Sequence, residues 1–385
     1  MTRPIYLDYH ATTPADPRVV EAMLPYFTER FGNPSSRTHA FGWAARDAVE
    51  AARAQVAALI GAPARDVYFT SGATESNNTA LRGAARALSV RGRHIVTVVT
   101  EHPSVLETCR HLRDDGFVVD VLPVERSGLV SVSRLEAALR ADTILVSVMA
   151  ANNEVGVLQP LEQIGALAAS RGIALHTDAS QAVGKVAFDV ERVGATLVSL
   201  TAHKMYGPKG VGALYLRRHG VELPPLLFGG GQERGLRSGT LNVPAIVGFG
   251  RAAEIARQVL SEEGARLGHL RDRLLEGLRA AIPGLHVNGT MAERLPHNLN
   301  VSFEGVEGEA LVTAIDDIAV SSGAACGTGQ ATPSPILTAL GVDPDLALAS
   351  VRFGLGRWTT AEEIEYAIEK MGRVVAALRR QRVAV

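Results

Sequence analysis

Residues 176–210, HTDASQAVGKVAFDVERVGATLVSLTAHKMYGPKG, carry an acid and a lysine just after two apolar segments. The first segment covers residues 173–177 and ends in Asp178, and the second covers residues 195–201 and is followed by Lys204. Short apolar runs of this kind favour buried strands. The ends of neighbouring strands in an open α/β sheet face a common crevice, so we expect Asp178 and Lys204 to meet there.

An acid and a lysine at one crevice are the two groups that hold pyridoxal phosphate. The lysine amine forms a Schiff base with the aldehyde, and the carboxylate keeps the pyridine nitrogen protonated so that the ring can accept electrons. The alternative is that Asp178 caps a helix and that Lys204 is a solvated surface charge. The flanking residues favour the cofactor. A surface lysine does not require the turn at residues 207–210, and the Gln181 amide could reach the phenolic oxygen.

The composition is that of an ordinary globular protein. A length of 385 residues predicts about two to three domains. The net charge of −1 gives no basic field that would attract nucleic acid or an anionic membrane. Two cysteines make no disulfide framework, which favours a reducing compartment. The N-terminal residues lack the apolar core of a signal peptide, and no apolar run approaches the ~18 residues that span a bilayer. We therefore expect a cytoplasmic protein.

Small polar residues follow the apolar run at residues 67–70 and precede a predicted helix that ends near Leu88. The start of a helix after such residues binds anions well, because its backbone N–H groups point outward and its dipole favours negative charge. Thr74 is the candidate phosphate ligand at this position. The alternative is an ordinary helix cap, since a hydroxyl residue followed by a glutamate also suits a capping box.

Polar side chains follow several other predicted strands. His102 comes after the strand at residues 94–100, and its ring could stack on a flat cofactor and exchange protons. Asn153 follows the strand at residues 144–149. A lone histidine is more often structural, and a cap could explain any one of these residues. Parallel strands joined by helices would, however, line up the whole set along one edge of a sheet. That set is Thr74, His102, Asn153, Asp178 and Lys204.

The second half of the chain changes character after a Gly-rich polar loop at residues 227–242, which is long enough to be functional. A long helical pattern follows to about Ala281, and short strands then alternate with helices. We predict a large domain over residues 15–255. A smaller α+β domain would be made of residues 1–14 and 256–385. There is no set of Cys and His residues with metal-ligand spacing, so we expect no metal site.

The two cysteines have different surroundings. Cys109 falls in an apparent helix and is expected to be an inert, packed thiol. Cys326 sits in SSGAACGTGQATPSP, a stretch of small residues without apolar periodicity. A mobile loop of this kind would let a thiolate move into a crevice and out again to a partner. The alternative is an incidental exposed thiol.

Together these motifs resemble the cysteine desulfurases of the NifS/IscS type, which are fold-type I pyridoxal-phosphate enzymes. The resemblance extends over nearly the whole chain. The motifs that carry it are YLDYHATTP, FGNPSSRTH, FTSGATES, TEHPSV, NNEVG, HTDASQAVGK, TAHKMYGPKG, GGGQERGLRSGT, SSGAACG and SVRFGLGR. It implies an α/β fold in which a mostly parallel seven-stranded sheet lies between helices, with a smaller α+β domain. It also implies pyridoxal 5'-phosphate as the cofactor.

The resemblance implies a role for each candidate residue. Lys204 would be the Schiff-base lysine, Asp178 would face the pyridine nitrogen, and Gln181 would face the phenolic oxygen. His102 would stack on the ring. The other implied cofactor contacts are Ala73, Asn153 and, at the phosphate, Thr74, Thr201 and His203.

Two further residues would complete the site. Thr240 would reach the phosphate bound by the other subunit of a homodimer, so that each site needs both chains. Arg352 would hold the substrate carboxylate as a bidentate fork, with Asn153 also near the substrate.

The reaction that the resemblance implies converts L-cysteine to L-alanine. Lys204 would remove the Cα proton, His102 would move protons, and Cys326 would attack the substrate sulfur and keep it as a persulfide. A sulfur-acceptor or scaffold protein would then take it. The destination stays open between iron–sulfur cluster assembly, tRNA thiolation, cofactor synthesis and DNA sulfur modification. The competing interpretations are an aminotransferase or selenocysteine lyase on the same fold, and a non-catalytic sulfur-relay protein.

The chain departs from the family pattern in three places. Cys326 is followed by Gly-Thr-Gly-Gln where many relatives carry Ser-rich residues, which leaves the acceptor preference of this loop open. Thr201 stands where serine is frequent but keeps the hydroxyl. The sequence stops at Val385, without the longer tail that some relatives use to dock a scaffold protein.

Overall fold

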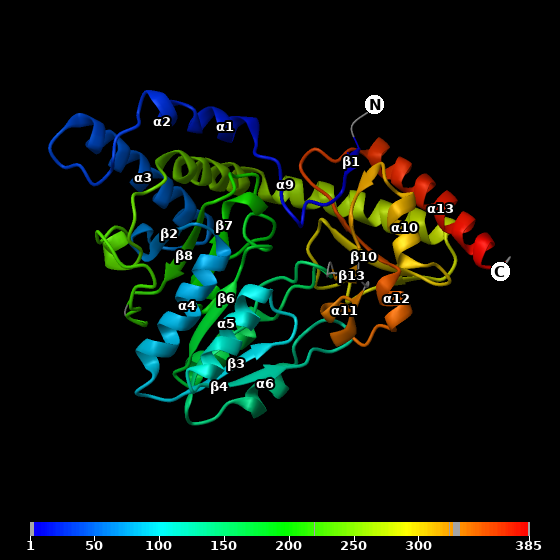
Figure 1. Ribbon diagram of the computed structural model, residues 1–385, viewed down its shortest axis with the longest axis horizontal. Helices are drawn as coiled ribbons and strands as arrows, with labels where there is room; N and C mark the ends of the chain where they lie inside the picture. Colours follow the sequence, from blue (N-terminus) through cyan, green and yellow to red (C-terminus); the bar gives the residue numbers. More distant parts are fainter. Residues whose placement is uncertain (1–3, 219, 323, 326–331, 384–385) are drawn as a thin grey trace.

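The computed structural model describes residues 4–218, 220–322, 324–325 and 332–383. The predicted persulfide residue, Cys326, lies outside the described residues. Two sheets dominate the described part, and Figure 1 shows them side by side, with the long helix α9 running past both.

The larger sheet has seven strands in the order β2-β8-β7-β6-β5-β3-β4. All its strands run parallel except β8, which is antiparallel to both of its neighbours. The predicted mostly parallel, seven-stranded sheet is therefore confirmed. Its strands are β2 (Val67–Thr70), β3 (His94–Val98), β4 (Val118–Leu122), β5 (Thr143–Ser147), β6 (Ala174–Asp178), β7 (Leu197–Thr201) and β8 (Gly212–Leu216).

Helices cover both faces of this sheet, as a parallel sheet requires. Every residue of the central strands β3, β5, β6 and β7 is buried. Alternate side chains of these strands belong to separate cores: Val96 and Val146 pack on one face, and Ile95 and Leu145 on the other. The helices of the first core include α3 (Ala40–Leu59), α7 (Leu161–Ser170), α8 (Val190–Val193) and the first half of α9 (Val243–Ala281). Those of the second are α4 (Ala73–Leu88) and α5 (Pro103–Asp114).

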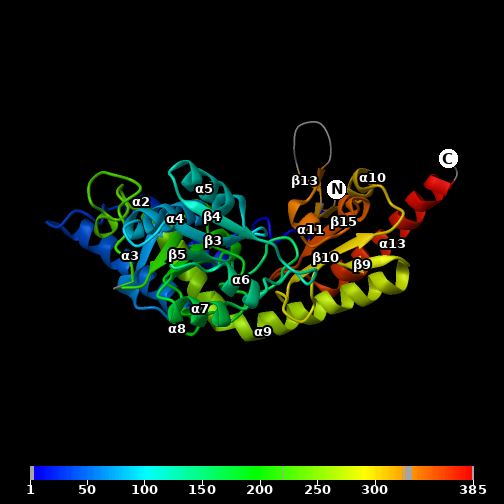
Figure 2. The same cartoon turned by 90° about the horizontal axis from the view of Figure 1, so that it is seen from below.

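The smaller sheet has four antiparallel strands in the order β12-β15-β10-β9. It packs against the second half of α9 and against the C-terminal helix α13 (Ala361–Val383), around a core that contains Leu274, Phe303 and Phe353. Figure 2 shows α9 passing beneath both sheets. The strands are β9 (Leu285–Val287), β10 (Asn298–Phe303), β12 (Ser321–Ser322) and β15 (Ser350–Gly354).

The N-terminal strand crosses back to the smaller sheet. Strand β1 (Ile5–Tyr6) pairs in parallel with β11 (Ile318–Ala319), and Asp8 bridges to Gly354. The first residues of the chain thus lie with the last third of it, as the predicted grouping of residues 1–14 with 256–385 requires. The boundaries of that grouping stay a prediction. The predicted helix at residues 243–281 is confirmed as α9, whose 39 residues span about 58 Å at 1.5 Å per residue.

The remaining helices and strands are short. They are α1 (Pro17–Met23), α2 (Pro25–Thr28), α6 (Val132–Ala138), α10 (Gly308–Ala314), α11 (Pro335–Ala339), α12 (Pro344–Leu348), β13 (Ala324–Ala325) and β14 (Thr332–Pro333). Among the described residues, no helix combines the length and the apolar character needed to cross a bilayer.

Candidate functional site

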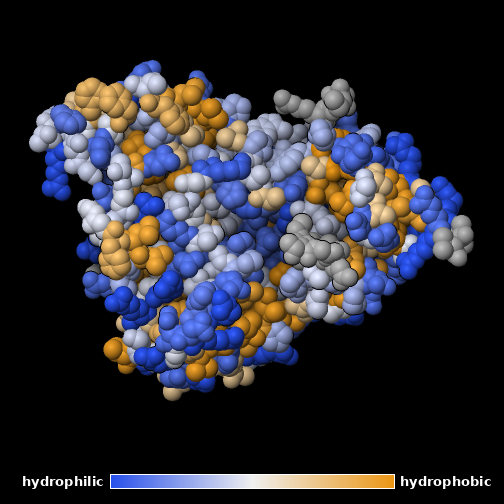
Figure 3. Space-filling view, in the orientation of Figure 1, coloured by the Kyte–Doolittle hydropathy of each residue, from blue (hydrophilic) through white to orange (hydrophobic). Residues whose placement is uncertain are grey.

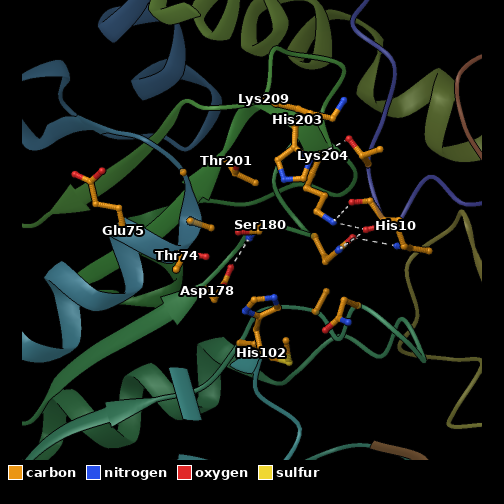
Figure 4. Close-up of a pocket in the computed structure, with 18 of the residues that line it drawn as sticks. His10, Thr74, Glu75, His102, Asp178, Ser180, Thr201, His203, Lys204 and Lys209 are labelled. Carbon is orange, nitrogen blue, oxygen red and sulfur yellow. Dashed lines mark hydrogen bonds between the residues drawn. The ribbon is translucent and has the colours of Figure 1, made fainter. Parts of the chain in front are cut away.

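A pocket of about 590 Å³ opens at the carboxyl ends of the parallel strands, where the smaller sheet meets the larger one. Figure 3 shows a hydrophilic hollow between the two parts of the molecule, and Figure 4 shows side chains from both parts around it. The predicted residues that line the pocket are Ala73, Thr74, His102, Asn153, Asp178, Gln181, Thr201, His203, Lys204 and Arg352. Thr240 lines a separate, smaller hollow of the same chain.

Lys204 ends the short 3₁₀ turn Ala202–Lys204 that follows β7. Its Nζ donates hydrogen bonds to the carbonyl oxygen of Ala11, at 2.7 Å, and to that of His10. Burial, and after it the positive charge of Arg352, lowers the pKa of Lys204 to about 8. A lysine with a lowered pKa is neutral in a larger fraction of molecules near neutral pH, and only the neutral amine is nucleophilic.

Asp178 is the last residue of β6 and is buried. Its Oδ2 accepts a hydrogen bond from the Asn77 side-chain amide at 2.7 Å, and its Oδ1 accepts one from the Ser180 backbone N–H at 2.9 Å. These two donors hold the carboxylate at the floor of the pocket, on the same sheet edge as Lys204. The contact with Ser180 is a local bond of the capping type, whereas the contact with Asn77 comes from α4 and ties Asp178 to another element of the fold.

Gln181 is held by His10, a residue that the sequence analysis did not single out. Asn298 Nδ2 donates to His10 Nε2 at 3.0 Å, so His10 Nδ1 carries the proton and donates to Gln181 Oε1 at 3.0 Å. Gln181 Nε2 in turn donates to the His10 carbonyl oxygen at 3.1 Å. This orients the Gln181 amide, whose second N–H remains for the pocket. Burial, and after it the Arg352 charge, lowers the pKa of His10 well below its usual value, which keeps the imidazole neutral.

The start of α4 provides an anion site next to Thr74. Gly72 is the N-cap and has a φ of +154°, and a Cβ on it would meet no atom within 4 Å, so the space in front of the helix is open. Thr74 itself is not the cap. The capping contact comes from Glu75, whose Oε2 accepts from the Ser71 N–H at 2.9 Å. The residues of this helix start, Gly72 to Thr74, line the pocket, and so does Lys209, whose positive charge also favours an anion there.

His203 faces the same end of the pocket as Thr201 (Figure 4). Burial, and after it the charges of Lys204 and Lys209, lowers the pKa of His203 to about 4, so its imidazole is neutral. Its Nδ1 makes a hydrogen bond with Thr12 Oγ1 at 3.1 Å.

Arg352 is the contribution of the smaller sheet to the lining of the pocket. It lies on β15, and its Nη1 donates to the Asn153 carbonyl oxygen at 2.8 Å. Its Nη2 donates to Asp8 Oδ1 at 2.7 Å and to Ser321 Oγ at 2.6 Å. The Nε is buried and has no partner among the residues that the structure describes. A guanidinium binds carboxylates through charge-assisted hydrogen bonds, and Arg352 already binds that of Asp8 next to the pocket.

The pocket as a whole fits pyridoxal phosphate. It holds a lysine of lowered pKa, a buried carboxylate, an oriented amide and a helix start with an open glycine cap. Its volume of about 590 Å³ lies within the few hundred to 1,000 Å³ common for sites of small ligands. The distance in sequence between its parts, for example 171 residues between His10 and Gln181, explains why the sequence identified the strand-end residues but not their supports.

Comparisons with known proteins agree with this geometry. The family model of the class-V aminotransferases matches residues 5–367. The cysteine desulfurase IscS of Anaeromyxobacter dehalogenans (strain 2CP-C) is 56% identical over 380 residues, which cover 98% of this chain and 94% of that protein. The human cysteine desulfurase is 50% identical over 378 residues, which cover 98% and 83%.

Solved structures agree in fold. A NifS-like protein superposes with a TM-score of 0.91 at 40% identity and covers 97% of this chain and 100% of that chain. SspA in complex with cysteine gives a TM-score of 0.81 at 36% identity, with 92% and 100% covered. The resemblance inferred from the motifs is confirmed: the chain belongs to the class-V aminotransferase family and, within it, to the cysteine desulfurases, which are pyridoxal-phosphate-dependent enzymes.

Proposed function

We propose that this protein converts L-cysteine to L-alanine at the pocket around Lys204 and leaves the sulfur as a persulfide on Cys326. The observation that carries the proposal is the meeting of three groups at one pocket: the Lys204 amine, the Asp178 carboxylate and the Arg352 guanidinium. The relatives named as cysteine desulfurases over nearly the full chain support the choice of reaction.

The cofactor would be held by the residues that line the pocket. Lys204 would bind it through the amine, Asp178 would pair with the pyridine nitrogen, and the free N–H of Gln181 would donate to the phenolic oxygen. The start of α4 with Ala73 and Thr74, together with Thr201 and His203, would hold the phosphate. Asn153 and His102 would contact the ring. When bound, pyridoxal phosphate accepts the negative charge that develops at the substrate Cα.

The remaining steps belong to the chain's own side chains. Arg352 would bind the substrate carboxylate, for which it must exchange its bond with Asp8. The Lys204 amine would take the Cα proton, since its lowered pKa of about 8 suits a base that works near neutral pH. The Cys326 thiolate would then attack the substrate sulfur. An S–S bond forms, the substrate C–S bond breaks, and the carbon takes up a proton to become alanine.

The other thiol is unsuited to this step. Cys109 is buried in α5, and burial, with the nearby Glu101 charge, raises its pKa to about 12. Only the thiolate is nucleophilic, so Cys109 is inert at neutral pH. Since the chain has two cysteines, the nucleophile would be Cys326.

The decisive experiment replaces Cys326 with alanine. We expect the purified Cys326→Ala protein to keep the yellow cofactor and to lose sulfur transfer to an added thiol. Cys109→Ala is the matched control and should keep both. Full sulfur transfer by Cys326→Ala would refute the persulfide step.

A homodimer would complete the site through Thr240. Thr240 lines a hollow separate from the Lys204 pocket of its own chain, which fits a role in the pocket of a second copy. Large apolar side chains are also exposed on the N-terminal helices and the loops between them, as expected for a surface that a partner covers. They are Leu24, Phe27, Phe31, Phe41 and Trp43, each at least half exposed.

Mixed dimers test the contribution of Thr240. Lys204→Ala and Thr240→Ala are each expected to be inactive, but their mixture forms heterodimers in which one of the two sites is intact if Thr240 acts across the interface. Random reassociation would then restore about a quarter of the wild-type activity, since half of the dimers are mixed. A mixture as inactive as its components would show that Thr240 does not act across the dimer.

The partner that takes the sulfur would be a thiol-bearing acceptor or scaffold protein in the cytoplasm. The two cysteines, too few for a disulfide framework, support that compartment. Loading the enzyme with radiosulfur from labelled L-cysteine and following the label to other proteins would identify the acceptor. Retention of the label on the enzyme in the presence of all cytoplasmic proteins would contradict an acceptor of this kind.

A further inference from the structure

A chain of side-chain hydrogen bonds leads from Asp178 to His102 through two residues that the proposed function does not use. Asn77 Nδ2 donates to Asp178 Oδ2 at 2.7 Å and to Ser104 Oγ at 2.9 Å. Ser104 Oγ lies 2.8 Å from His102 Nδ1. The chain therefore joins the end of β6 to the start of α5 through the first turns of α4, and both of its ends line the pocket.

The carboxylate sets the direction of every bond in this chain. A carboxylate only accepts, so Asn77 must turn its NH₂ group toward Asp178. The second hydrogen of that NH₂ group then points at Ser104 Oγ, which must accept it. Asn77 Oδ1 is buried and accepts from none of the described residues. An unsatisfied buried acceptor is costly, so the contact with Asp178 must be what holds the amide in this orientation.

The direction continues to the imidazole. Because Ser104 Oγ accepts from Asn77, its own hydrogen is free to point at His102 Nδ1. The Ser104 backbone N–H also donates to that nitrogen, at 3.1 Å, and a backbone N–H can act only as a donor. His102 Nδ1 thus accepts from both the hydroxyl and the backbone N–H of Ser104. Burial lowers the pKa of His102, and the start of α5 also disfavours a cation there. The single proton of the neutral ring must then be on Nε2.

We propose that Asn77 and Ser104 are positioning residues that transmit the charge of Asp178 to His102 and hold its imidazole in the tautomer with the proton on Nε2. The proposal deepens the proposed function and rests on it for the role of His102. That residue would enter the reaction as a neutral N–H donor at Nε2. It would therefore offer a hydrogen bond from Nε2–H and keep that proton, since losing it would leave an imidazolate and Nδ1 is engaged on the other side of the ring.

The tautomer can be read directly by ¹⁵N nuclear magnetic resonance of the full-length holoenzyme labelled at histidine nitrogens. The resonances of His102 are those that disappear in a His102→Gln variant. We expect an unprotonated Nδ1 and a protonated Nε2 at pH 8. A proton on Nδ1, or an imidazolium at that pH, would overturn the proposal.

Variants then test each link. Ser104→Ala should lower the ratio of the Nε2-H to the Nδ1-H tautomer by about two- to twelvefold, the size of one lost neutral hydrogen bond. Ser104→Thr, which keeps the hydroxyl, should restore the ratio. Asn77→Leu should lower it as well, because the Ser104 hydroxyl is then free to accept from Nδ1-H. The matched control is Thr108→Ala, which removes a hydroxyl of α5 that donates to the Ser104 carbonyl oxygen and not to His102.

The coupling between the links gives the sharpest discrimination. If Asn77 acts through Ser104, the double variant Asn77→Leu, Ser104→Ala should change the ratio no more than Ser104→Ala alone. Independent, additive changes would overturn the chain, as would an unchanged ratio in both single variants. The tautomer is measured whether or not alanine is formed. Loss of activity in Cys326→Ala with a normal His102 tautomer therefore supports the proposed function separately.

Discussion

A half-buried lysine, Lys204, and a buried one, Lys185, differ in their access to the pocket. Burial lowers the pKa of Lys204 to about 8, and it lowers that of Lys185 to about 7. Lys204 lines the pocket and donates to two backbone carbonyl groups. The Lys185 Nζ is sealed from solvent, lies 4.0 Å from the centroid of the Tyr206 ring, and has no hydrogen-bond partner in the described part of the chain. A lowered pKa therefore does not distinguish the two lysines, whereas access to the pocket does, and it favours Lys204 for the proposed chemistry.

The cluster of Tyr206, Lys185 and Arg357 lies next to the turn that carries Lys204. Tyr206, two residues after Lys204, has a φ of +66°, a conformation that bulky residues adopt only when their surroundings impose it. Lys185 and Arg357 both lie over its ring, and its hydroxyl accepts from the Arg357 N–H at 2.7 Å. Its own N–H donates to Thr13 Oγ1 at 2.8 Å. These contacts fix the turn from which Lys204 projects.

The largest expected difference between substitutions of Lys204 and of Lys185 is in enzymatic activity. Lys204→Ala should reduce alanine formation from saturating L-cysteine by about 10²–10⁴-fold or more, because the base proposed for the Cα proton is lost. Lys185→Met, which preserves the length of the side chain, should stay within about tenfold of wild type, a loss below the range for a missing catalytic base. The comparison fails if Lys185→Met is as inactive as Lys204→Ala while it still binds the cofactor.

The next effect distinguishes a pocket arginine from a sealed one. Arg352→Lys should raise the KM for L-cysteine by about ten- to hundredfold, since a charge-assisted fork is replaced by a point charge. Arg294 is also buried but donates only within the smaller part of the molecule, to Thr290, Asn288 and Asn298. Arg294→Lys serves as the control and should change stability rather than KM. If Arg352→Lys and Arg294→Lys change the KM equally in steady-state kinetics, Arg352 has no special role in binding L-cysteine.

The sealed lysine should make stability depend on pH. Below about pH 7 Lys185 is protonated in the folded and unfolded states alike. Between about pH 7 and the ordinary lysine value of 10.5, the unfolded chain holds the proton and the folded one does not, so raising the pH stabilises the fold. The slope from this residue is at most about 1.4 kcal/mol per pH unit.

Urea unfolding at pH 7, 8 and 9 measures this slope. Lys185→Met should be more stable than wild type at pH 7 and should gain less stability as the pH rises. A slope unchanged by the substitution would show that Lys185 is not the group that titrates.

The smallest effect is expected from loss of the Tyr206 hydroxyl, which accepts from the Arg357 N–H. Tyr206→Phe removes the acceptor of the Arg357 N–H and should lower the free energy of unfolding by about 1 kcal/mol. The ring and both cations over it remain, so we expect kcat to change by less than about threefold, which is under 1 kcal/mol in the barrier. A large fall in kcat with unchanged stability would mean that the hydroxyl, and not the ring, positions Lys204.

The sequence predicted those site residues that lie at or just after the end of a strand. Asp178 and Lys204 end or follow neighbouring strands, and parallel topology brings such ends to one edge, so their meeting was expected from order alone. The resemblance of the motifs added Arg352 and Thr240. The supports were not predictable. His10 and Asn77 carry no local pattern, because their hydrogen bonds to Gln181 and Asp178 span 171 and 101 residues and depend on packing and not on spacing. The bond between Asn77 and Ser104 spans 27 residues and depends on packing in the same way.

The amino-acid sequence by itself determined the order of strands and helices, the family, and the identity of the strand-end groups, because hydrophobic periodicity and turn residues act over a few neighbours. Only the tertiary structure showed that Lys185 is sealed against the ring of Tyr206, and it alone set the direction of the hydrogen-bond chain from Asp178 to His102. The physical reason is that desolvation and hydrogen-bond direction depend on everything packed around a group, which local sequence does not encode.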